Sequence, residues 1–173
     1  FLDWVKDRSL LFHGATVATM LRRDSYFFSR LGTFIERADN TARIVDVKYH
    51  ILLPEQAEVG GGIDYYQWAS ILRAGSVYRQ GLKPWLIVEF LTLREEMPRS
   101  LASCSLGIKE SLDHLADEYG QRHECHRMAG QIHSRLRFGQ VDDIFRQGLH
   151  EFLSEHIENN NRLAYEISRA YLF

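Results

Sequence analysis

The chain has 173 residues, of which 45% are hydrophobic and 25% are charged, so it suits one globular domain with a substantial core. Its formal net charge of −2 argues against a domain that binds duplex nucleic acid, because such domains normally carry a basic excess. No run of about 18 apolar residues occurs, so we expect no membrane-spanning helix. Cys104 and Cys125 fall inside helical patterns, which favours reduced, buried thiols in a cytoplasmic protein.

The N-terminal part of the chain predicts two helices. The first spans about residues 2–17, with Gly14 as an interruption, and its apolar pattern begins at Phe1 rather than after a Met. We therefore expect a fragment of a longer protein, or a processed chain. The second helix begins at Asp24, a residue type that caps helices, and ends before Pro54. Its apolar face comprises Phe27, Leu31, Phe34, Ile35, Ala38, Ala42, Val45, Tyr49 and Leu52.

The middle of the chain predicts a loop and two further helices. Residues 54–62 end in three consecutive glycines and form the most flexible segment of the sequence. Asp64 begins a third helix, and a fourth helix carries apolar residues from Trp85 to Leu93. Pro98 then fits the first turn of a fifth helix, where proline is tolerated.

The C-terminal part predicts the remaining helices. Gly120 is placed to end the fifth helix, and the sixth ends near residue 138. A seventh helix covers 141–172 with near-heptad apolar spacing, and the triplet Asn159–Asn161 favours a kink in it. The sequence therefore predicts one all-α domain, a bundle of about seven helices with long helices near 24–53 and 141–172.

The polar side of the helix at 24–53 carries a concentration of charge. Asp39 and Arg43 are four residues apart in the acid-before-base order that favours an ion pair along a helix. Glu36 precedes Arg43 by two turns, and a second, basic row consists of Arg23, Arg30 and Arg37. Two interpretations remain open here. The side is a solvated surface with ion pairs, or other helices cover it and the charges have partners or a ligand.

Several of these residues together resemble the Alpha-E family, a bacterial, predicted all-helical family named for its Glu-Arg motif. The resemblance begins with Thr19-Met20-x-Arg22 and continues through Phe28-x-x-Leu31-Gly32-x-x-x-Glu36-Arg37-Ala38-Asp39-x-Thr41-Ala42-Arg43. It extends to Trp68-x-x-x-Leu72-Arg73 with Tyr78-Arg79, to Glu89-Phe90-Leu91 with Pro98-Arg99-Ser100, and to Gly148-Leu149-His150. The chain departs from the family at Thr33, where an arginine commonly follows the glycine.

The resemblance implies a context but no reaction. Family members are about twice this long and carry an earlier Glu-Arg helix, so the chain corresponds to their C-terminal half. The family has no established activity, and its genes commonly lie beside, or are fused to, ATP-grasp amide-ligase-like and transglutaminase-like partners. This implies a role in a bacterial system that makes or modifies peptide-like amide bonds, with an ATP-grasp-type or transglutaminase-like protein as partner.

The resemblance also indicates that the Glu-Arg helix is covered by neighbouring helices. Glu36 is then expected to accept from Arg73 or Arg99, and Arg37 to donate to another carboxylate such as Glu89. Arg99 lies at a predicted helix start, where an anion site with Arg37 or Arg43 competes with simple capping and packing. The candidate ion-pair or anion-site residues are Glu36, Arg37, Asp39, Arg43, Arg73 and Arg99.

Other patterns give weaker signals. The cluster His123–His126, which includes Cys125, and the more distant His133 match no zinc signature, so we expect no metal and no cofactor. No nucleophile elbow and no phosphate-binding loop occur, so no catalytic residue is assigned. His156 and Asn160 fall near the apolar stripe of the last helix, where a buried Asn that sets register is favoured over a ligand contact.

Three functional hypotheses follow. The first is a non-catalytic helical domain that binds a partner enzyme or peptide. The second is an enzyme, or half of one, that acts on a small carboxylate or phosphorylated ligand at an inter-helix Arg/Glu site. The third is a dimerisation module. The first predicts uncovered apolar surface, and the second predicts arginines without protein carboxylates.

Overall fold

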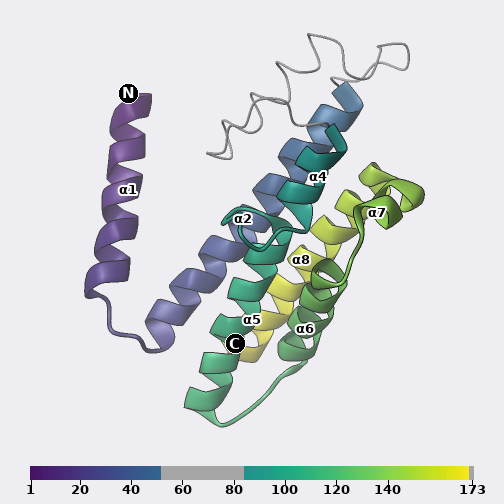
Figure 1. Ribbon diagram of the computed structural model, residues 1–173. Coiled ribbons are helices and arrows are strands. Elements are labelled where there is room, and N and C mark those ends of the chain that lie inside the picture. The colour runs from purple at the N-terminus through teal and green to yellow at the C-terminus, as the bar shows by residue number, and fades with distance from the viewer. Residues whose placement is uncertain (52–83, 172–173) are drawn as a thin grey trace.

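The computed structural model describes residues 1–51 and 84–171, and almost all of them lie in helices (Figure 1). The helices are α1 (Leu2–Thr19), α2 (Asp24–Ile51), α4 (Pro84–Thr92), α5 (Leu101–Tyr119), α6 (Glu124–Arg137), α7 (Val141–Gln147) and α8 (Leu149–Tyr171). The predicted all-α class is therefore confirmed. The predicted loop at 54–62 and the predicted third helix, with Arg73, lie outside the described residues. None of the described helices is long and apolar enough to cross a membrane.

Four helices form the body of the bundle. Helix α2 packs against α5 and α8, and α6 packs against the same two helices from the other side, while α4 and α7 contact each other at one end (Figure 1). The buried apolar residues form two clusters along this bundle. One includes Val45, Leu91 and Leu153, and the other includes Leu31 and Leu112. Helix α1 stands apart from these four helices beside α2 (Figure 1).

The ends of α5 follow from its sequence. The Ser100 side chain accepts the Ser103 N–H at 3.0 Å and so caps the N-terminus. Pro98 therefore precedes the helix, rather than lying in its first turn as predicted. At the other end Gly120 adopts a φ of 68°, the left-handed conformation that favours glycine, and this confirms the predicted C-terminus.

Three details of the predicted helices are wrong. The single helix at 141–172 is divided into α7 and α8, because Gly148 adopts a φ of 101° that no helix contains. The apolar spacing continues across this break, which is why periodicity alone missed it. Conversely, Gly14 does not interrupt α1, and α8 runs unbroken through Asn159–Asn161.

Asn160 links α8 to α2 by a hydrogen bond, so its substitution is expected to lower the stability of the protein. Its side chain is 2% exposed, and Nδ2 donates to the Ile35 carbonyl oxygen at 2.9 Å. We expect Asn160→Ala to lower the free energy of unfolding by about 1–3 kcal/mol, because a buried hydrogen bond and buried volume are lost. Urea denaturation measures the effect, and Asn161→Ala, which alters an exposed neighbour, is the control. Equal stability of the two variants would contradict the role of Asn160.

Candidate functional site

The predicted site residues of α2 have different partners. Arg43 forms a two-point ion pair with Asp39, with Nε and Nη2 at 2.7 and 3.0 Å from the two carboxylate oxygens. This confirms the predicted pair, and the hydrogen bonds raise the pKa of Arg43. The pair lies within one helix, so it does not join α2 to a neighbour. Glu36 and Arg37 line a hollow together with residues of α1.

A groove separates α1 from α2 and contains the Glu-Arg pair. Two adjoining hollows of about 370 and 310 Å³ share Arg37 among their lining residues. Glu36, Asn40 and Arg99 line the first hollow, and Arg30 lines the second. We refer to the two hollows together as the ER groove. The fold thus brings together Glu36, Arg37 and Arg99 from the predicted set, whereas Asp39 and Arg43 line neither hollow.

An aromatic ring positions two of the arginines. Arg30 and Arg37 both contact the Phe34 ring, and their guanidinium carbons are 4.9 and 6.0 Å from its centroid. Arg30 also donates to the Tyr26 hydroxyl at 3.2 Å. Phe34 in turn rests on Gly107 of α5, where any Cβ would fall 2.5 Å from the ring. The absence of a side chain at Gly107 therefore allows Phe34 to hold both guanidinium groups at the groove.

The third arginine is held through its backbone. The Thr41 hydroxyl of α2 donates to the Arg99 carbonyl oxygen at 2.8 Å. The next residue, Ser100, caps α5 and donates its own hydroxyl to the Arg94 carbonyl at 2.6 Å. These bonds fix the start of α5 against α2, while the Arg99 side chain remains exposed beside the groove.

The charges in the ER groove form no ion pair with a described residue. Burial lowers the pKa of the half-buried Arg37, and the nearby positive charges of Arg99 and Arg30 lower it further. Across residues 1–51 and 84–171, no ion pair involves Glu36 or any of these three arginines. The expected pairing of Arg37 with Glu89 does not form, because Glu89 bonds Arg94 at 2.6 Å instead.

The expected pairing of Glu36 with Arg99 is also absent from the described residues, and Arg73 lies outside them. Sequence reasoning did not select Arg30 or Phe34 for the site. The sequence signal that could have identified them is the basic row, in which Arg30 lies seven residues before Arg37 with an aromatic residue between them.

The comparison with protein families concerns nearly the whole chain and includes this dipeptide. A sequence model of Alpha-E, described as a predicted alpha-helical domain with a conserved ER motif, matches residues 1–172. Glu36-Arg37 is the one Glu-Arg dipeptide in the sequence, so the motif is the pair that lines the groove. The chain belongs to the Alpha-E family. Neither the curated proteins nor the solved structures contain a match to it.

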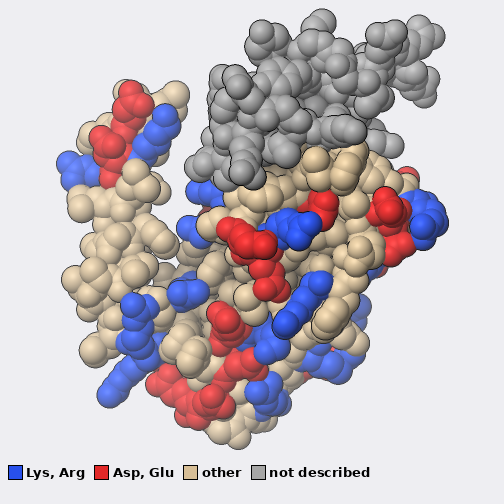
Figure 2. Space-filling model, in the orientation of Figure 1, with Lys and Arg blue, Asp and Glu red and all other residues tan. Residues whose placement is uncertain are grey.

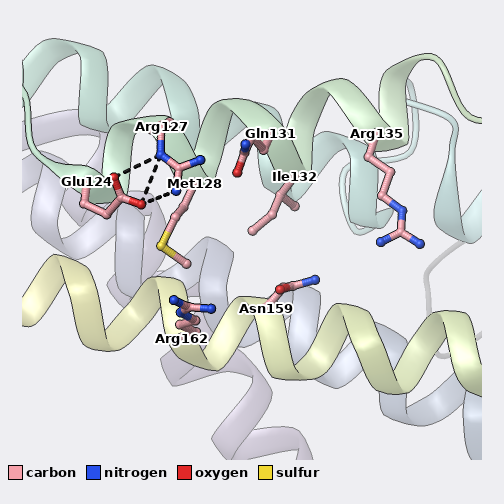
Figure 3. A pocket seen from close by; sticks show the side chains of 8 residues that line it. All are labelled: Glu124, Arg127, Met128, Gln131, Ile132, Arg135, Asn159 and Arg162. Atoms are coloured by element: carbon pink, nitrogen blue, oxygen red, sulfur yellow. Dashed lines mark hydrogen bonds and ion pairs between the residues drawn. The ribbon is translucent and has the colours of Figure 1, made fainter.

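A second hollow of this Alpha-E chain shows a different charge arrangement. It lies between α6 and α8 and has a volume of about 250 Å³ (Figure 3). Figure 3 shows Arg127 bonded to Glu124, with Nε 3.0 Å from each carboxylate oxygen. Arg135 is paired with Glu155. Both arginines that α6 contributes are therefore neutralised by the protein itself, unlike those of the ER groove.

In this Alpha-E chain, the histidines at the start of α6 have a structural role. His126 Nδ1 accepts the His123 N–H at 2.9 Å, which leaves Nε2 to donate to the Leu112 carbonyl oxygen at 3.1 Å. No group of three or more potential metal ligands occurs among the described residues. Both cysteines are buried and free, and burial raises the pKa of each thiol to about 11.

Proposed function

We propose that this chain is a helical binding domain that serves a bacterial amide-ligase system of ATP-grasp type, or another peptide-modifying system, and contacts a partner enzyme through α1. The observation that supports this most directly is that α1 buries none of its side chains. The class of partner comes from the Alpha-E resemblance and its ATP-grasp and transglutaminase-like gene context.

Helix α1 presents apolar side chains in every direction. Leu10, Leu11 and Phe12 are 71%, 61% and 71% exposed, and consecutive helical residues point about 100° apart. Residues 9–21 contain no Asp, Glu, Lys or Arg, and Figure 2 shows a stretch of α1 without blue or red side chains on the face in view. A helix that is apolar on all sides is normally buried on all sides. This favours a partner that covers α1 beyond the surface that faces α2.

A double variant in α1, compared with a control variant in α8, tests whether α1 is the surface that binds the partner. Trp4 and Leu11 are two turns apart on one side of α1, and neither lines the ER groove. We expect the double variant Trp4→Ser/Leu11→Ser to bind the purified ATP-grasp-type protein of the same host about 100-fold more weakly, since each side chain contributes roughly 1.5–3 kcal/mol when buried. Isothermal titration calorimetry measures the affinities.

The matched control is Tyr165→Ser, which removes a side chain that is 63% exposed on α8 and is expected to leave the affinity unchanged. Equal binding by wild type and the α1 double variant would refute the proposed surface. Sedimentation of the wild-type chain over a range of concentrations tests the alternative occupant, a second copy of the chain. If the chain forms a dimer and the α1 substitutions abolish it, a second copy of the chain covers α1 in place of a partner enzyme.

A second candidate function is favoured by the arginines of the ER groove. Arg30, Arg37 and Arg99 form no ion pair with a described residue. This matches the expectation for an enzyme, or half of one, that acts on a small carboxylate or phosphorylated ligand. This function would be supported over the binding domain if the chain converts a bound ligand chemically, if Arg37→Gln abolishes that turnover, and if Tyr165→Ser remains fully active. Stable binding without turnover would support the binding domain.

A further inference from the structure

We propose that the ER groove binds an oxyanion, a phosphate or a carboxylate, between the guanidinium group of Arg37 and those of Arg30 and Arg99. The charged residues of this site come from α2 and from the segment before α5, whereas α1 forms the opposite wall of the groove. Anion binding here also assigns a role to the Glu-Arg motif that requires no reaction.

The first argument is that the fold holds like charges together without neutralising them. Arg30 and Arg37 both stay close to the Phe34 ring, which rests on α5 at Gly107. The Arg99 backbone is bonded to α2 through Thr41. The mutual repulsion of the guanidinium groups is therefore a cost that packing imposes, and a bound anion would offset it.

The second argument is the contrast with the hollow between α6 and α8. Of the three arginines that line it, Arg127 and Arg135 each have a carboxylate partner within the protein, and Arg162 alone forms no ion pair with a described residue. The described carboxylate that lines the ER groove, Glu36, forms no ion pair with a described residue, while Asp39 and Glu89, which line neither hollow, pair with Arg43 and Arg94. The groove thus keeps guanidinium donors available in a hollow of several hundred cubic ångströms, which is the size of a small-ligand site.

The third argument concerns the chemistry of the donors. A guanidinium group presents parallel N–H donors whose geometry matches two oxygens of a carboxylate or phosphate. Asn40 lines the same hollow and adds an amide, and Ser103, in the first turn of α5, lines the adjoining hollow. Arg37 is half-buried, so its attraction for an anion is screened less by water than that of a fully exposed arginine.

Glu36 sets the charge of the site. Its side chain lines the groove beside Arg37 but makes no ion pair with a described residue. A carboxylate at this position repels a bound oxyanion, and so limits how much negative charge the groove accepts. Replacing it with the neutral Glu36→Gln variant is therefore expected to tighten anion binding by a few-fold, which is the opposite effect to loss of an arginine.

The test is a calorimetric titration of the chain with inorganic phosphate, and separately with N-acetyl-dialanine as its free acid and as its amide. We expect saturable binding of at least one anion with a Kd of about 1 mM or lower, and none of the uncharged amide. Arg37→Gln and Arg99→Gln should each weaken binding about ten-fold or more, because each removes charge-assisted hydrogen bonds. The two anionic probes distinguish a phosphate site from a site for a peptide carboxylate.

The matched control is Arg43→Gln, which removes an arginine from the same helix but outside the groove, and it should leave the Kd unchanged. Equal weakening by Arg43→Gln would mean unspecific counter-ion attraction and would overturn the proposal, as would the absence of saturable binding. Arg99 is exposed, so its variant remains informative if Arg37→Gln fails to fold. The Trp4→Ser/Leu11→Ser variant should bind the anion as wild type does, which separates this result from the partner test.

Discussion

Acidification from pH 6.5 to pH 4 is expected to destabilise the protein by roughly 3 kcal/mol through a single side chain, His156. The side chain is 7% exposed, and its Nε2 has no hydrogen-bond partner among the described residues. Burial, followed by the nearby charge of Arg135, lowers the pKa of His156 from 6.5 to about 4. The unfolded chain binds a proton near pH 6.5 while the folded chain does not. The stabilising contribution is therefore complete above pH 6.5 and is lost as the pH falls toward 4.

The measurement is the free energy of unfolding by urea between pH 4 and pH 7.5, for wild type and for His156→Leu. Leucine fills a similar volume without a titratable group, so the difference between the two curves isolates His156. The subtraction is needed because burial also lowers the pKa of His133, while Asp46 raises that of His150, whose effect has the opposite sign. His114→Gln, an exposed substitution on α5, is the control. Parallel curves for wild type and His156→Leu would contradict the prediction.

The helical architecture was predictable because apolar periodicity is a local property of the sequence. The face that includes Leu31, Ala38 and Val45 was read from spacing alone, and these residues are buried against α5 and α8. Backbone conformation was less visible. The apolar repeat is the same on both sides of Gly148, so nothing in it marked the positive φ that divides α7 from α8.

The candidate site was only partly predictable because its arrangement depends on tertiary contacts. The Asp39–Arg43 pair follows from a spacing of four within one helix, and the structure contains it. Partners across helices cannot be read this way, and Glu89 finds Arg94 five residues away rather than Arg37. The role of Phe34 depends on a glycine in α5 that is distant in sequence, so no local pattern could reveal it.

Substitution of that glycine is expected to damage both the core and the ER groove. In Gly107→Ala the new Cβ would lie 2.5 Å from two ring carbons of Phe34, a separation that requires the ring to move. We expect the free energy of unfolding to fall by about 1–2 kcal/mol, because the cost of overpacking exceeds the gain from replacing a helical glycine with alanine. Gly130→Ala in α6 is the matched control, since its Cβ would meet no atom within 4 Å. That variant should gain about 0.5–1 kcal/mol.

The effect on the groove distinguishes this prediction from general destabilisation. A displaced Phe34 ring can no longer contact both Arg30 and Arg37, so Gly107→Ala should also weaken phosphate binding, whereas Gly130→Ala should not. The double variant Gly107→Ala/Phe34→Leu should recover stability, because the smaller side chain relieves the overlap, but it should not recover anion affinity, because the ring that contacts the arginines is gone. If Gly107→Ala is as stable as Gly130→Ala and its anion affinity is unchanged, Phe34 does not position these arginines.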